Sequence, residues 1–306
     1  MVDERTFTQG LAAFFGARSG DLPGLLVGIG DDAAVVRAER RPLVLKIDPV
    51  VEGVHVAAAL PAARLGIKAV NRNLSDLAAM GAVPRWLLAS VLLPRGYPAA
   101  RRAGIFRGLR AAARGAGVRV VGGDVSNTRG AAAVVVAAFG VVPGRPLLRS
   151  GARVGDTLHV TGALGGSCLG RHHRFVPRLR EGLWLARDPA VHAAMDVSDG
   201  LLLDLQTLLD ASGCPGAELE EAAIPIASAA RRLARRSGTT ALAHALGDGE
   251  DYELLFAARG TLRRNGPLAP LAHHPIGRIT SRRGLWLRTL DGRLRRLRPE
   301  GYRHAL

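Results

Sequence analysis

The feature that most constrains the fold of this chain is a repeated order of apolar run, small residues and acid. It occurs at residues 25–32, where two glycines precede Asp31 and Asp32, and again at residues 44–48, 118–124, 195–200 and 247–251. A short apolar run bounded by glycine is typical of a buried strand, whereas a carboxylate resists burial. The pattern therefore predicts strands that end in carboxylates, gathered around metal ions and phosphates.

Strands and helices alternate along the chain, which predicts an α/β fold with α+β character. Apolar runs indicate strands at residues 43–47, 86–93, 118–121, 132–142, 157–161, 252–257 and 276–279. Helical patterns are found at residues 6–17, 61–81, 100–115 and 201–211, and a hairpin is expected at 285–297. The sequence Pro143-Gly144-Arg145-Pro146 interrupts regular structure. We therefore expect an N-terminal domain at residues 1–145 and a C-terminal α/β domain at residues 146–306.

Composition narrows the class of protein. No apolar run approaches the roughly 18 residues that a membrane-spanning helix needs, and the N-terminus lacks the pattern of a secretion signal. The two cysteines, Cys168 and Cys214, form no metal-spaced pair. We expect a cytoplasmic protein with no membrane partner.

The formal net charge of +16 raises the alternative of a basic nucleic-acid-binding protein. Only two of the 42 basic residues are lysines, the arginines are scattered, and aromatic residues make up 4% of the chain. A base-stacking surface needs aromatic side chains among its cations. We therefore expect no nucleic-acid partner; salt-sensitive binding that ignores Mg²⁺ and ATP would favour one.

Each acidic motif also has a purely structural interpretation. Asp31 and Asp32 suit a helix N-cap, and Asp76 suits an ion pair with Arg72 four residues earlier. His55 suits an ordinary hydrogen-bonded loop position. Asp196 and Asp199, three residues apart before an expected helix, suit either a cap or a phosphate site at the helix N-terminus. There is no P-loop or protein-kinase catalytic loop in the sequence.

Taken together, the motifs resemble the thiamine-monophosphate kinase family, in the superfamily of aminoimidazole ribonucleotide synthetase. Nine stretches carry the resemblance, in the family's order: GIGDDAAV at 28–35, DPVVEGVH at 48–55, NLSDLAAMGA at 73–82, GGD at 122–124, RSGARVGD at 149–156, VTGALG at 160–165, MDVSDGLLLD at 195–204, GEDYELLF at 249–256 and IGRIT at 276–280. They run through most of the chain, which makes the resemblance specific.

The resemblance implies transfer of a phosphoryl group from ATP to thiamine phosphate, giving thiamine diphosphate, on a cluster of Mg²⁺ ions held by carboxylates. It also implies a homodimer formed by the N-terminal domain, which would bind metal and ATP. The implied metal ligands are Asp31, Asp32, Asp48, Asp76, Asp124, Asp196 and Asp199, of which Asp124, Asp196 and Asp199 would be catalytic. The implied ATP contacts are Gly123, Asp124, Arg149 and Ser198, and the implied substrate contacts are His55, Glu250 and Tyr302.

Two positions depart from the family's pattern. Ile47 stands where the family usually has a threonine, which we interpret as the loss of a hydroxyl ligand to metal. The chain ends in GYRHAL, without the family's final phenylalanine, so Tyr302 is the expected ring for stacking on thiamine. Rival interpretations are a superfamily member that phosphorylates a different acceptor and a scaffold that binds nucleotide without turnover.

Overall fold

The computed structural model describes residues 4–18, 21–29, 33–260, 262 and 272–302. The chain forms two compact units: unit 1 comprises Met1–Leu77 and Val83–Pro143, and unit 2 comprises Ala78–Ala82 and Gly144–Leu306. The fold is a two-domain α/β fold, as predicted. Unit 2 includes seven residues of the predicted N-terminal domain, namely residues 78–82, 144 and 145. Within the described residues, no helix is both long enough and apolar enough to cross a membrane.

Unit 1 is built on a four-stranded sheet in the order β3-β6-β4-β5. Strands β4 and β5 are parallel, and the other two pairs are antiparallel. Its elements are α1 (Glu4–Phe15), β1 (Leu25–Val27), β2 (Val35–Val36), β3 (Leu43–Val51), α2 (Ala63–Ala79), β4 (Val83–Pro94), α3 (Ala99–Gly115), β5 (Arg119–Thr128) and β6 (Ala133–Val141).

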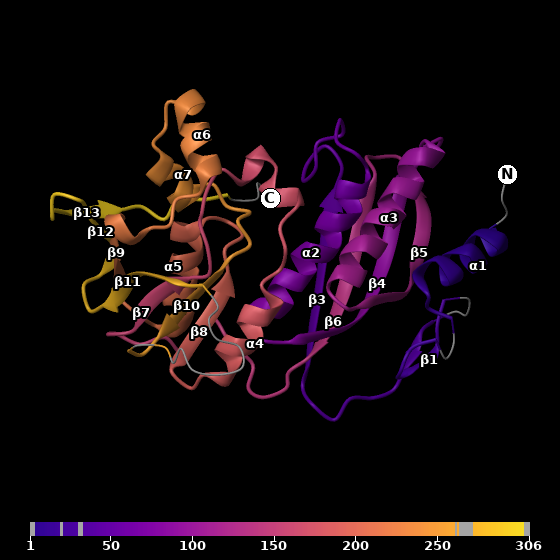
Figure 1. Ribbon diagram of the computed structural model, residues 1–306, viewed down its shortest axis with the longest axis horizontal. Coiled ribbons are helices and arrows are strands. Elements are labelled where there is room, and N and C mark those ends of the chain that lie inside the picture. Colours follow the sequence, from indigo (N-terminus) through magenta and orange to yellow (C-terminus); the bar gives the residue numbers. More distant parts are fainter. Residues whose placement is uncertain (1–3, 19–20, 30–32, 261, 263–271, 303–306) are drawn as a thin grey trace. The chain divides into compact units, whose positions relative to one another are not determined.

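The two faces of this sheet differ. Helices α2 and α3 lie over one face (Figure 1), and alternate residues of β4, such as Leu87, Ala89 and Val91, are buried. On β3, the side chains of Leu43, Leu45 and Ile47 are 52%, 65% and 62% exposed. Successive residues of a strand point to opposite faces, so these three share one face of the sheet. We call the face that carries Leu43, Leu45 and Ile47 the open face.

Strand β5 is longer than the sequence analysis predicted. The predicted strand stopped at Val121, whereas β5 continues through Gly122, Gly123 and Asp124 to Thr128. A register shift opposite Leu87 and Leu88 of β4 absorbs one residue and lets pairing resume at Gly122. Asp124 therefore lies within a strand, paired with Ser90, and not in a loop after it.

Unit 2 is built on a seven-stranded sheet in the order β13-β12-β9-β11-β7-β10-β8. Its longer elements are β7 (Thr157–Val160), α4 (Leu179–Arg187), β8 (Val191–Asp196), α5 (Leu201–Ser212), β9 (Gly216–Glu220), α6 (Ser228–Ser237), α7 (Ala241–Gly247), β10 (Leu254–Ala258), β11 (His274–Thr280), β12 (Gly284–Arg288) and β13 (Leu294–Leu297). Three short 3₁₀ helices are Ser167–Leu169, Arg171–His173 and Glu221–Ala223.

Strand β10 shows why this sheet has an apolar sequence. All five of its residues are buried. Leu255 and Ala257 belong to a core that includes residues of α5, whereas Leu254 and Phe256 belong to a second core with α4 and the end of α2. The sheet is thus covered on both faces, which favours a continuous apolar run over alternation. The second core also explains why residues 78–82 belong to unit 2.

Helices α2 and α3 contact each other at glycines, so a substitution at one of these glycines tests the packing of unit 1. A Cβ atom on Gly108 would lie 2.1 Å from the carbonyl oxygen of Ala63. We expect Gly108→Ala to lower the free energy of unfolding by about 1–3 kcal/mol, because overpacking outweighs the better helix propensity of alanine. Urea denaturation measures the change. Gly115→Ala, at a glycine of the same helix with nothing within 4 Å, is the control and should be neutral or stabilising.

Candidate active site

The loop between β8 and α5 is organised by one carboxylate. Strand β8 ends at Asp196, α5 begins at Leu201, and Asp204 lies in the first turns of α5. The backbone N–H groups of Ser198, Asp199 and Gly200 all donate to Asp204 Oδ2, at 3.0, 3.0 and 3.2 Å. From the sequence, these amides were expected to suit a phosphate. Within the chain they already bind Asp204.

The carboxyl groups of Asp196, Asp199 and Asp204 lie close enough to interact electrostatically. Burial, and then the charges of Asp196 and Asp199, raise the pKa of Asp204 to about 8, although its bonds from the backbone N–H groups of Asp199 and Gly200 oppose the shift. Asp196 is itself buried. Carboxylate oxygens in such proximity are the donors that Mg²⁺ prefers, so Asp196 and Asp199 fit a divalent cation chemically.

A second segment runs alongside this loop. The N–H of Glu250 donates to the carbonyl of Ser198 at 2.7 Å, and the N–H of Tyr302 donates to the carbonyl of Asp199 at 2.8 Å. Glu250 has a φ of 54°, in the left-handed region that non-glycine residues adopt mainly where surrounding structure enforces it. The structure therefore brings together five predicted residues of unit 2: Asp196, Ser198, Asp199, Glu250 and Tyr302.

The side chain of Glu250 is oriented by two neighbours. The hydroxyl of Tyr252 donates to Glu250 Oε1 at 3.2 Å, and His172 Nδ1 lies 3.3 Å from Oε2. Tyr252 is stacked on Phe175 with ring centroids 3.8 Å apart. Tyr302 keeps 54% of its surface exposed. A carboxylate suits a cationic ligand, and an exposed ring such as that of Tyr302 suits stacking on an aromatic one.

The glycine loop after β7 is held by carboxylates in the same manner. The N–H of Gly165 donates to both oxygens of Asp251, and the N–H of Gly166 donates to Asp248 Oδ2 at 2.7 Å. Burial raises the pKa of Asp251 to about 7, with further contributions from Glu253 and Asp248 against the opposing Gly165 N–H and Arg171. These amides, like those before α5, are bound within the chain.

Asp248 also ends a chain of hydrogen bonds in the order Ser-His-Asp, which the sequence analysis did not identify. Ser237 Oγ lies 2.7 Å from His244 Nε2, and His244 Nδ1 lies 2.8 Å from Asp248 Oδ1. This is the geometry of a hydrolase triad. Ser237, however, is exposed at the end of α6 and already accepts the N–H of Thr239 at 3.2 Å. We interpret the chain as a structural link from α6 and α7 to the glycine loop.

Glu253 is a buried residue to which the sequence analysis gave no role. Its carboxylate receives two bonds from Arg178, at 2.7 and 2.6 Å, one from Thr161 at 2.6 Å, and a contact from Arg171. Its side chain is fully buried, and two guanidinium groups balance the charge. Glu253 therefore anchors the glycine loop and the segment before α4 to the start of β10.

In unit 1, the predicted ligands Asp48 and Asp76 share one cation, that of Lys46. Lys46 Nζ lies 3.2 Å from Asp48 Oδ2 and 3.3 Å from Asp76 Oδ2. Burial would lower the pKa of Lys46, but Asp76 and Asp48 outweigh it and the pKa is raised. Arg72, a possible partner of Asp76 by sequence, lies 3.3 Å from Asp48 through its Nε. Nearby, His55 Nδ1 accepts the N–H of Val51 at 3.0 Å.

Asp124 lies apart from this pair within the chain. Asp48 is in register with Val136, Ala89 and Gly123 across the sheet, whereas Asp124 is one residue further along β5 and faces the other side. Three interstrand spacings make the separation of β3 and β5 about 14 Å. Gly123 allows the close approach of β4, since a Cβ atom there would lie 1.9 Å from the carbonyl of Ala89.

Arg149, the other predicted residue of unit 2 that the structure describes, does not join the unit 2 group. Arg149 is exposed, and its carbonyl accepts the hydroxyl of Ser212 at the end of α5 that is far from the Asp196–Asp199 loop. Asp31 and Asp32 lie outside the described residues. Among the described residues, no group of three or more His, Cys, Asp or Glu side chains is arranged to hold a metal ion.

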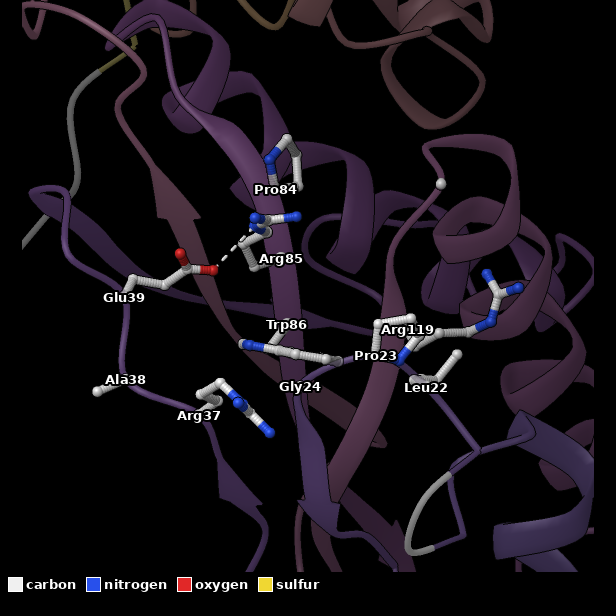
Figure 2. A pocket seen from close by; sticks show the side chains of 11 residues that line it. Leu22, Pro23, Gly24, Arg37, Ala38, Glu39, Pro84, Arg85, Trp86 and Arg119 are labelled. Carbon is white, nitrogen blue, oxygen red and sulfur yellow. Dashed lines mark ion pairs between the residues drawn. The ribbon is translucent and has the colours of Figure 1, made fainter.

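Unit 1 also has a pocket of about 420 Å³ that contains none of the predicted site residues (Figure 2). Arg37, Arg85, Arg119 and Trp86 line it, and Arg85 pairs with Glu39 at 3.1 Å. Its cations could attract an anion, but a lone, already paired carboxylate is a poor ligand set for Mg²⁺. We therefore do not assign the phosphoryl-transfer chemistry to this pocket.

Comparison with known proteins supports one family. Residues 30–142 match the family model described as AIR synthase related protein, N-terminal domain. Thiamine-monophosphate kinase of Rhodopirellula baltica is 38% identical over 97% of both chains. A structure described as AaThiL complexed with AMPPCP and TMP is 29% identical, with a TM-score of 0.77 and coverage of 90% of this chain and 92% of that one. E. coli HypE, at 24% identity and a TM-score of 0.76 over 98% and 99% of the chains, shares the fold.

The contacts of Asp204 lead to a prediction about the β8–α5 loop. Asp204→Ala leaves three backbone N–H groups without their acceptor, so we expect the free energy of unfolding to fall by about 2 kcal/mol. Amide hydrogen exchange at residues 198–200 should become faster. Asp204→Asn keeps an acceptor oxygen and should lose less. Asp210→Ala is the control on the same helix, because Asp210 is exposed and its described side-chain partner is Gln206. An equal loss there would contradict the assignment.

Proposed function

The chain belongs to the thiamine-monophosphate kinase family, and we propose that it phosphorylates thiamine phosphate with ATP and Mg²⁺ to give thiamine diphosphate. The enzyme is a phosphotransferase, and AMPPCP, the ligand of AaThiL, is an analogue of ATP. The observation that carries the proposal is the group in unit 2, where Asp196, Asp199, Glu250 and Tyr302 are joined by backbone hydrogen bonds and short loops. Asp196 and Asp199 supply carboxylates for a metal–phosphate complex, and Glu250 and Tyr302 supply a charge and a ring suited to a cationic aromatic ligand.

The reaction requires little proton transfer by the protein. The acceptor is a phosphate oxygen, which is anionic at neutral pH, so no strong general base is needed. The barrier arises from bringing two polyanions together, and bound Mg²⁺ would supply the neutralising charge. Asp196 and Asp199 would hold the ion. Their loop is fixed in advance by Asp204, so orientation requires little rearrangement during catalysis.

The other residues receive roles that follow from their chemistry. Glu250 would pair with the cationic ring of thiamine phosphate, and Tyr302 would stack on it. Ser198 would contact ATP, with Gly123 and Asp124 of β5, and Arg149 would bind phosphate through charge-assisted bonds. His55 remains a proposed substrate contact, and Asp31, Asp32 and Asp124 remain proposed metal ligands. A cytoplasmic location also remains a prediction.

We further propose that the functional form is a homodimer joined through the open face of unit 1. Leu43, Leu45 and Ile47 lie on an edge strand and expose more than half of their surface. Each such side chain contributes roughly 1.5–3 kcal/mol when it is fully buried. A second copy of the same face would bury this apolar stripe of Leu43, Leu45 and Ile47 and would cover the free edge of β3.

The kinase proposal is tested with purified protein, ATP, Mg²⁺ and thiamine phosphate. We expect chromatography to show thiamine diphosphate, and Asp199→Asn to lower kcat by about 100-fold or more, because a charge that positions the reacting phosphates is lost. Asp124→Asn tests the role of β5 in the same assay. The exposed Asp210→Asn is the control and should retain full activity. If Mg²⁺-ATP binds but no product forms, the acceptor is wrong and the proposal fails.

The dimer proposal predicts that Ile47→Glu makes the protein monomeric in sedimentation equilibrium, because it introduces an unpaired charge into the stripe. Leu290→Glu is the matched control, since Leu290 is a 76% exposed leucine of a turn in unit 2. Dissociation by both variants, or by neither, would contradict an interface on the open face.

A further inference from the structure

Lys46 occupies the position between two carboxylates where a cation would bind. Its ammonium contacts Asp48 Oδ2 of its own strand at 3.2 Å and Asp76 Oδ2 of α2 at 3.3 Å. The three side chains are only partly exposed, at 31%, 20% and 23% of their surface. The ammonium therefore links β3 to α2 through Asp76.

Counted over the four described residues in these contacts, the charges sum to zero without an added ion. Lys46 and Arg72 carry two positive charges, and Asp48 and Asp76 carry two negative ones, with Arg72 Nε 3.3 Å from Asp48 Oδ2. Like charges this close repel one another strongly where water is partly excluded. A divalent ion added to the pair would meet the ammonium at close range and would have to displace it.

The distances also differ from those of a metal site. Mg²⁺ binds oxygen at about 2.0–2.1 Å, roughly 1 Å shorter than the two distances from Lys46 Nζ. Both carboxylates would therefore have to move inward as the ammonium left. The pair has the right donor atoms for Mg²⁺, but its present arrangement fits an ammonium group.

The choice of lysine is itself unusual in this chain. Of 42 basic residues, 40 are arginine, and the two lysines are Lys46 and Lys68. Lys68 is also on α2, is fully buried, and donates to the carbonyl of His55 at 2.8 Å. An ammonium is a compact point charge that can lie between two acids, whereas a guanidinium is a broad planar fork. At position 46, a lysine therefore suits the space between the two acids.

We propose that the Lys46 ammonium is the resident cation of the Asp48–Asp76 pair, so that this pair does not bind a divalent ion. The proposal deepens the kinase function, on which it rests, by separating the predicted metal ligands into two classes. Asp196 and Asp199 hold exchangeable metal. Asp48 and Asp76 position β3 against α2 through Lys46, and removal of Lys46 converts them into a metal site.

The experiment counts Mn²⁺ ions bound per chain by electron paramagnetic resonance, on the full-length protein without nucleotide or thiamine phosphate. We expect Asp76→Asn to bind as many Mn²⁺ ions as the unchanged protein. Lys46→Gln should bind one more, and the double variant Lys46→Gln/Asp76→Asn should lose that additional ion. Because the readout contains no substrate, it stands or falls separately from the kinase assay.

Two controls distinguish the effect of the cation at position 46 from the effect of losing any positive charge in unit 1. Lys46→Arg keeps a positive charge and should gain no Mn²⁺ site. Arg85→Gln removes one positive charge from another ion pair of unit 1, that with Glu39, and should also gain none. A lower Mn²⁺ count in Asp76→Asn overturns the proposal, as does a folded Lys46→Gln variant with no additional ion. If Lys46→Gln fails to fold, as judged by circular dichroism, the Asp76→Asn comparison decides.

Discussion

Repulsion between neighbouring carboxylates is the constraint on which the rest of this structure depends. A chain with a net charge of +16 nevertheless concentrates its acids in a few short motifs. Such groups are stable only where each carboxylate has a donor or a cation of its own. In unit 2 the donors are largely backbone N–H groups, whereas in unit 1 the described partners of Asp48 and Asp76 are side-chain cations.

These two solutions have different chemical consequences. Asp204 and Asp251 accept N–H groups that would otherwise be available to phosphate, and thereby fix the loops that carry Asp199 and the glycines. The proposed ligands of an exchangeable metal, Asp196 and Asp199, lie at the end of β8 and on the loop that Asp204 fixes. An acid held by an ammonium, such as Asp48, is already neutralised and suits a fixed support.

Much of the fold could be predicted from the sequence, because α2, β4 and α3 have clear apolar periods and end at or close to a glycine or proline. Strand β3 was predicted too short, since it continues beyond Ile47 through Asp48 to Val51. The turn that carries Asp196 and Asp199 was predicted on the same grounds. The strand order was not predictable, and it is this order that separates Asp48 from Asp124. The contact of Tyr302 with Asp199 joins residues about a hundred positions apart, which local patterns do not reveal. Lys46 was missed although its rarity among 40 arginines was a signal.

Ile47 shows how strand geometry changes the interpretation of a substitution. From the sequence, an isoleucine in place of the family's threonine suggested a lost hydroxyl ligand beside Asp48. In β3, however, adjacent side chains point to opposite faces, so Ile47 lies on the open face and Asp48 on the other. A hydroxyl at position 47 of this strand would face away from Asp48. The isoleucine instead extends the apolar stripe of Leu43 and Leu45, so its effect belongs to the sheet surface and not to the carboxylate pair.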